Sequence, residues 1–212
     1  MKSRLKDCLL SRCLLDFLCG LEQCMCGLEL GVILDIYDTP VYCVYLWTVI
    51  LWQGLSWSEC SPSPASHLVS WRSGGQSLPW CMLRSVAGLA GALLSHRVIS
   101  LVWSYDLSHY HDNRELVTGS GHCMDELQVS LPAGVLVEAM GALTGLIIEL
   151  WLLETRVSAF PLLGFSLNSA VAVTLVMLGF DLTGGYYSPS LALGLKLGCG
   201  QGTSQDLLLK FG

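Results

Sequence analysis

The stretch that decides the fold is residues 181–199, which read DLTGGYYSPSLALGLKLGC. It follows a charge-free apolar run, Phe160–Phe180, which is long enough to cross a bilayer because a spanning helix needs about 20 apolar residues. Two glycines then open a loop, and Pro189 precedes a short amphipathic segment, Leu191–Leu197. Proline suits the first turn of a helix, and this segment is too short to span. The pattern therefore predicts a re-entrant half-helix.

A second segment of the same kind lies in the first half of the chain. Ser63-Pro64-Ala65 precedes a short stretch, Ser66–Trp71, and Ser188-Pro189-Ser190 stands 125 residues further on. Two such segments are typical of half-helices that enter from opposite sides and meet near the membrane middle. Their free N–H groups and dipoles make both starts positive. Facing a narrow pore, these ends would repel cations and offer hydrogen bonds to water.

The composition agrees with a chain solvated by lipid. Hydrophobic residues make up 52% of the 212 residues, charged residues only 13%, and the mean hydropathy is +0.56, whereas soluble domains are roughly a quarter charged. The net charge is −6 and no block of basic residues is present. Because nucleic-acid binding needs clustered Lys and Arg, a nucleic-acid partner is excluded.

Five apolar stretches are long enough to span. Besides Phe160–Phe180 they are Cys8–Leu34, Val41–Trp57, Pro79–Trp103 and Val129–Leu153. The basic N-terminus places the start of the chain in the cytoplasm. We predict an all-α membrane protein, one domain over residues 1–212, with five transmembrane helices and two re-entrant half-helices.

Two acidic residues inside these spans indicate an internal inverted repeat. Asp16 and Glu138 stand 122 residues apart in the first and fourth spans. A buried carboxylate is costly unless it accepts hydrogen bonds, so we expect both to brace the pore loops. For Asp16, facing a lumen or snorkelling stays open. The repeats cover about 8–105 and 126–212, and the second lacks the sixth spanning helix that the pattern requires.

These residues resemble a known family. Thr183-Gly184-Gly185-Tyr186 before Ser188-Pro189-Ser190 is similar to the second pore loop of superaquaporins, a branch of the aquaporin, or major intrinsic protein, family. In that loop a Thr-Gly-Gly-Tyr run leads into Asn-Pro-x, and a cysteine follows nine residues later, as Cys199 does here. Residues 57–67 align with the first loop and place Ser63-Pro64-Ala65 on its Cys-Pro-Tyr. We expect an arthropod-type member that is truncated at its C-terminus.

The resemblance implies a passive channel for water and for small neutral solutes such as glycerol or hydrogen peroxide. It implies a homotetramer embedded in membrane lipid, in the endoplasmic reticulum or the plasma membrane, with no cofactor, metal or catalytic residue. The chain departs from orthodox members where Ser63 and Ser188 replace the pore asparagines. Leu191 also takes the place of their selectivity arginine, which widens the expected constriction and removes a cationic filter.

The same residues fit other interpretations. Ser63 and Ser188 could be ordinary helix caps, because Ser is a preferred N-cap residue. The chain could be a non-conducting partial aquaporin that assembles only with full-length subunits. A membrane enzyme could use a metal site, although a solvated loop is the favoured interpretation of the segment that carries its candidate ligands, His109, His111, His122 and Cys123.

Overall fold

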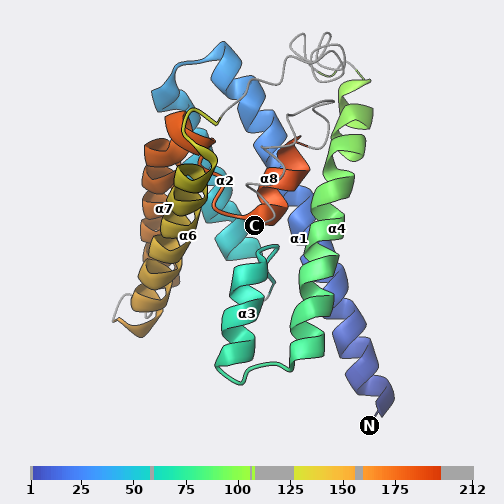
Figure 1. Ribbon diagram of the computed structural model, residues 1–212. Coiled ribbons are helices and arrows are strands. Elements are labelled where there is room, and N and C mark those ends of the chain that lie inside the picture. Colours follow the sequence, from blue (N-terminus) through green and yellow to red (C-terminus); the bar gives the residue numbers. More distant parts are fainter. Residues whose placement is uncertain (1, 58–59, 106, 108–126, 156–159, 197–212) are drawn as a thin grey trace.

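The computed structural model describes residues 2–57, 60–105, 107, 127–155 and 160–196. Within these ranges the chain forms α-helices and no strand (Figure 1). The helices are α1 (Lys2–Ile36), α2 (Thr39–Ser56), α3 (Pro64–Arg72), α4 (Leu78–Trp103), α6 (Leu131–Glu154), α7 (Pro161–Thr183) and α8 (Pro189–Lys196). The predicted all-α fold class is confirmed.

Prolines mark the starts of these helices. A proline occupies one of the first two positions of α2, α3, α4, α6 and α7, and α8 begins at Pro189. Proline is pre-organised for the first turn, where its missing N–H would have had no partner in any case. The two short helices begin at Pro64 and Pro189, the prolines that were expected from the sequence in their first turns.

Four helices are long and apolar enough to cross a membrane. The qualifying stretches are Leu10–Ile36, Leu78–Trp103, Leu131–Leu152 and Pro161–Thr183, and they coincide with four of the five predicted spans. Helix α2, with 18 residues and several aromatic ones, is not among them. Large apolar side chains on the outer helices, such as Leu136, Ile147 and Leu178, are exposed. In lipid such side chains are in their preferred solvent, so the chain is an integral, multi-pass membrane protein.

The two short helices lie in the middle of the bundle. In Figure 1, α3 runs from the centre toward the end of the bundle where α4 begins, and α8 leaves the centre in the opposite direction. Helix α3 packs on α4, whereas α8 packs against both α1 and α4. At Gly194 of α8 an added Cβ would lie 2.9 Å from the Ala92 carbonyl oxygen. Short helices are tolerated at membrane depth only when neighbours bury them in this way.

Small residues bring α1 and α4 together. An added Cβ on Gly20 of α1 would collide with the Gly88 carbonyl of α4, and one on Gly91 would collide with the Phe17 carbonyl. Glycines at such positions let the backbones of membrane helices approach closely. This close contact forms the wall on which α3, α8 and the segment before α3 rest.

Candidate functional site

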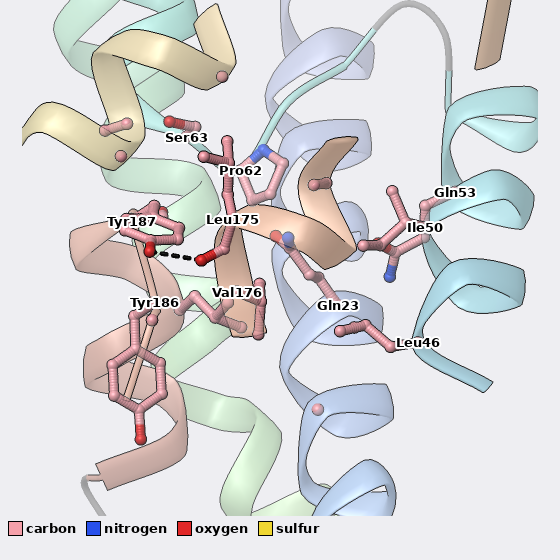
Figure 2. A pocket seen from close by; sticks show the side chains of 18 of the residues that line it. Gln23, Leu46, Ile50, Gln53, Pro62, Ser63, Leu175, Val176, Tyr186 and Tyr187 are labelled. Carbon is pink, nitrogen blue, oxygen red and sulfur yellow. Dashed lines mark hydrogen bonds between the residues drawn. The ribbon is translucent and has the colours of Figure 1, made fainter. Parts of the chain in front are cut away.

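A cavity of about 400 Å³ lies where the two short helices begin. Its wall includes residues from α1, α2, α6, α7 and α8 and from the segments before α3 and α8 (Figure 2). Ser63 and Ser188, the residues just before α3 and α8, both line it, and so does Leu191. We call this space the central cavity. Two helix starts that are far apart in the sequence therefore face one space.

The lining of the central cavity is mostly apolar with a few polar side chains. Figure 2 shows Leu46 and Ile50 of α2 and Val176 of α7 beside the amides of Gln23 and Gln53. The Gln53 Nε2 atom is buried and has no hydrogen-bond partner among the described residues. An unpaired buried N–H costs about 1–3 kcal/mol, and a cavity water can remove that cost. The wall therefore presents a free donor to a small polar guest.

The hydroxyl groups of the two serines are also available. Ser63 is the N-cap residue of α3, yet its side chain makes no capping hydrogen bond. The buried Ser188 Oγ has no partner within the described part of the chain. Neither hydroxyl therefore forms a hydrogen bond with the N-terminus of the helix that follows it. This weakens the interpretation of both serines as ordinary caps.

Asp16 of α1 anchors the segment before α3. Its side chain is fully buried, and its Oδ1 accepts a hydrogen bond from the Ser61 backbone N–H at 3.0 Å. Arg84 of α4 binds the same carboxylate through two nitrogens, Nε to Oδ2 at 2.6 Å and Nη2 to Oδ1 at 3.0 Å. Paired hydrogen bonds of this kind are strong and directional, so α1, α4 and the segment form one rigid unit.

His67 holds the same segment from α3. Its Nε2 lies 2.9 Å from the Ser61 carbonyl oxygen, and because a carbonyl can only accept, this nitrogen carries the proton. The His67 carbonyl in turn accepts a hydrogen bond from Gln76 Nε2 at 2.7 Å. The backbone of Ser61, two residues before Ser63, is thus fixed on both its N–H and its C=O side.

Glu138 of α6 anchors the segment before α8. Its Oε1 accepts from Thr183 Oγ1 at 2.6 Å and from the Tyr186 N–H at 3.3 Å. Its Oε2 accepts from the Tyr187 N–H at 2.5 Å. One carboxylate therefore satisfies three donors, one at the end of α7 and two in the irregular loop that follows it.

Glycine and tyrosine shape this second loop. Gly185 has φ +63°, and an added Cβ would lie 2.6 Å from the Val176 carbonyl oxygen, so only glycine fits. The Tyr187 ring occupies the space left by the missing side chains of Gly141 and Gly179. Its hydroxyl donates to the Leu175 carbonyl at 2.6 Å, the dashed line in Figure 2. These contacts hold Ser188 at the wall of the central cavity.

Comparison with known proteins decides the family. No protein-family model matches the chain. The chain is 32% identical to aquaporin-11 of Equus caballus over 189 residues, which make up 87% of this chain and 66% of the relative. It is 29% identical to aquaporin-11 of Homo sapiens, again over 87% of this chain and 66% of the relative. It is 28% identical to putative aquaporin-12A of Homo sapiens over 81% of this chain and 56% of that relative.

The chain belongs to the aquaporin family. Its relatives named aquaporin-11 and aquaporin-12A place it in the superaquaporin branch, which confirms the resemblance drawn from residues 181–199. The chain spans 66% of the length of the aquaporin-11 relatives from horse and human. Members of this family are membrane channels.

The predicted pore residues of this aquaporin fall into two groups. Those that line the central cavity are Ser63, Ala65, Gly184, Gly185, Tyr186, Ser188 and Leu191. Those that shape or anchor the loops and helix starts are Asp16, Pro64, Glu138, Thr183, Pro189 and Ser190, whose carbonyl oxygen accepts from the Cys24 thiol at 3.8 Å. Cys199 and the candidate metal ligands His109, His111, His122 and Cys123 lie outside the described residues.

Other cavity residues of this aquaporin were missed from the sequence. Gln23, Gln53, Glu149 and Asn168 all line the central cavity. Each is a polar residue inside a predicted apolar span, and that position was the feature of the sequence from which a place at a cavity could have been predicted. Arg84, the partner of Asp16, carried the same signal as the one charged residue in the first half of its span. Within the described ranges no group of three or more His, Cys, Asp or Glu side chains is arranged to hold a metal ion.

Proposed function

We propose that this aquaporin is a channel for the passive passage of water and of small neutral solutes such as glycerol or hydrogen peroxide. The main support for this proposal is that Ser63 and Ser188 line the same cavity. These serines precede two short helices and stand 125 residues apart. Neither serine side chain caps its helix. In this proposal α2 completes a set of five transmembrane helices, and α3 and α8 are re-entrant half-helices.

The proposed selectivity against ions follows from the two helix starts. The first N–H groups of a helix have no partner within it, and the aligned peptide dipoles add partial positive charge there. Two such ends at one cavity make the entry of a cation unfavourable, whereas a neutral molecule can accept their hydrogen bonds. Ser188 Oγ and Gln53 Nε2 would supply further hydrogen bonds to a passing solute.

The proposed tolerance of solutes larger than water follows from the apolar wall. Leu191 stands directly after the second motif and lines the cavity together with Leu46 and Val176. An apolar side chain there brings neither a cation nor a rigid donor array. We therefore propose modest discrimination between water and small neutral solutes.

The proposal also covers the oligomeric state of the protein and the membrane in which it resides. The family resemblance supports a homotetramer in which each subunit has its own pore, in the endoplasmic reticulum or the plasma membrane. It also supports a single domain built from two inverted repeats, about 8–105 and 126–212. The exposed apolar side chains of α6 and α7 would face lipid or neighbouring subunits.

Osmotic shrinkage of proteoliposomes, followed by stopped-flow light scattering, tests the channel. We expect the 212-residue chain to shrink faster than empty liposomes. Ala172 of α7 lines the cavity, so Ala172→Trp should return shrinkage to the empty rate. Ala170 lies on the same helix but is exposed and is not part of the cavity wall, so Ala170→Trp should conduct. Wild-type shrinkage at the empty rate, or equal loss in both variants, would contradict the proposal.

A further inference from the structure

Two cysteines outside the cavity wall lie on neighbouring segments beside the first pore loop. Cys19 is on α1, and Cys60 is three residues before Ser63, in the segment between α2 and α3. Trp57, three residues before Cys60, donates from its Nε1 to Glu22 Oε2 at 2.7 Å, and Glu22 is three residues after Cys19. This hydrogen bond ties one end of the Cys60 segment to α1.

A second hydrogen bond ties the other end of this segment to α1. Asp16 and Cys19 are three residues apart on α1, so their side chains lie on one face of the helix. Asp16 accepts a hydrogen bond from the backbone N–H of Ser61, the residue after Cys60. The two hydrogen bonds thus hold Cys60 beside Cys19, although 41 residues separate the two cysteines in the sequence.

We infer that Cys19 and Cys60 form a redox-sensitive thiol pair, which a small hydroperoxide oxidises to a disulfide that ties the segment before α3 to α1. Because hydrogen bonds already hold the two segments together on either side of the cysteines, the sulfur atoms need only a small approach to reach the S–S bond length of about 2.05 Å. Rotation of the two side chains about their Cα–Cβ bonds can supply that approach without moving the Ser61 backbone. The cross-link would make the attachment of the segment before Ser63 to α1 covalent.

The chemistry uses both thiols and one peroxide. Cys60 is only partly buried, whereas Cys19 is 5% exposed, so the Cys60 sulfur attacks the peroxide O–O bond first. That bond breaks, Cys60 becomes a sulfenic acid, and the other oxygen leaves as water when the peroxide is hydrogen peroxide. The Cys19 sulfur then attacks the sulfenic sulfur: the S–S bond forms, the S–O bond breaks, and a second water leaves. Two thiols are oxidised and one peroxide is reduced.

The reaction should be slow. Burial raises the pKa of the Cys60 thiol above its ordinary value, which lowers the fraction of reactive thiolate at neutral pH. The position of the two cysteines on segments that hydrogen bonds tie together, and not unusual reactivity of either thiol, is what favours this pair over the other cysteines. Exposure to millimolar peroxide for many minutes is therefore the appropriate treatment.

The test is disulfide mapping on the full chain reconstituted in lipid. The reduced protein is treated with hydrogen peroxide, its remaining thiols are alkylated, and a non-reducing digest is analysed by mass spectrometry. We expect a peptide pair that joins Cys19 to Cys60, the loss of two alkylatable thiols per chain, and reversal by dithiothreitol. Cys60→Ser should abolish the linked pair, whereas Cys43→Ser, which changes a partly buried cysteine on α2, should retain it.

Two results would overturn the inference. One is a native chain in which Cys19 and Cys60 remain fully alkylated while other cysteines oxidise. The other is a linked pair that forms only after the protein has been unfolded in detergent. The wild-type map needs no substitution, so a variant that fails to fold does not decide the test. The readout is a mass and not a transport rate, so failure of this inference is distinct from failure of the proposed channel function.

Discussion

At the scale of single residues, the buried ion pair between Asp16 and Arg84 is the contact with the largest expected effect. Asp16 is fully buried and Arg84 is nearly so, and each is costly to leave alone in a medium of low dielectric constant. The pair is held by two short hydrogen bonds, and Asp16 also supports the Ser61 backbone. The role of the pair is to position the first pore loop, because neither side chain is part of the cavity wall.

We predict that Arg84→Met lowers the stability of the protein by about 3–5 kcal/mol, because it leaves the Asp16 carboxylate buried without its partner. The measurement is the midpoint of thermal unfolding in detergent. Arg97→Met is the matched control, since Arg97 lies on the same helix but is exposed. An equal shift in both variants would show that the Asp16 contact is not the cause. The double variant Asp16→Asn with Arg84→Met should recover part of the loss.

At the scale of helices, glycines decide how closely α1 and α4 pack. The backbone of Gly91 lies against the Phe17 carbonyl, and Gly20 lies against the Gly88 carbonyl. Dispersion contacts between close backbones are a main source of stability for helix pairs in lipid, where the hydrophobic effect does not drive association. The same close packing supports α8, which contacts both helices.

We predict that Gly91→Ala destabilises the protein by about 1–3 kcal/mol, the usual range for overpacking, because the new methyl group forces α1 and α4 apart. Gly31→Ala on α1 is the control. An added Cβ at Gly31 meets nothing within 4 Å, so this change should be neutral or should stabilise by up to about 1 kcal/mol through helix propensity. Thermal unfolding in detergent measures both. Equal destabilisation by the two substitutions would contradict the packing explanation.

At the scale of the whole molecule, the proposed transport depends on how the bundle surrounds one cavity. Its wall combines side chains from both halves of the chain, so its width and polarity belong to no single helix. Leu191 is the residue at which a single change should alter selectivity most clearly, because it follows the second motif and faces the cavity.

We predict that Leu191→Arg lowers glycerol permeability several-fold while reducing water permeability much less. A guanidinium occupies more of the opening and offers fixed donors that suit water. Separate light-scattering traces of proteoliposomes in water and glycerol gradients measure the ratio. Leu191→Met, which changes shape without adding charge, should leave the ratio near its original value. A glycerol rate that is unchanged in the arginine variant would remove Leu191 from the proposed selectivity position.

The local features of this aquaporin could be predicted from its sequence. Long apolar runs predicted four helices that are, in the structure, long and apolar enough to cross a membrane. Prolines predicted the starts of α3 and α8. The run from Thr183 to Ser190 identified the branch of the family. Each of these signals is contained in a contiguous stretch, because helix length and helix starts depend mainly on near neighbours.

The contacts between residues far apart in the chain required the folded structure. Arg84 with Asp16, Trp57 with Glu22, and Gln53 at the cavity wall are examples. A soluble helix shows its buried face as a periodic apolar stripe, but a helix in lipid is apolar on every side. The sequence pattern therefore does not reveal how each helix is rotated. That rotation was settled by the fit of glycines and a few polar side chains against neighbouring helices.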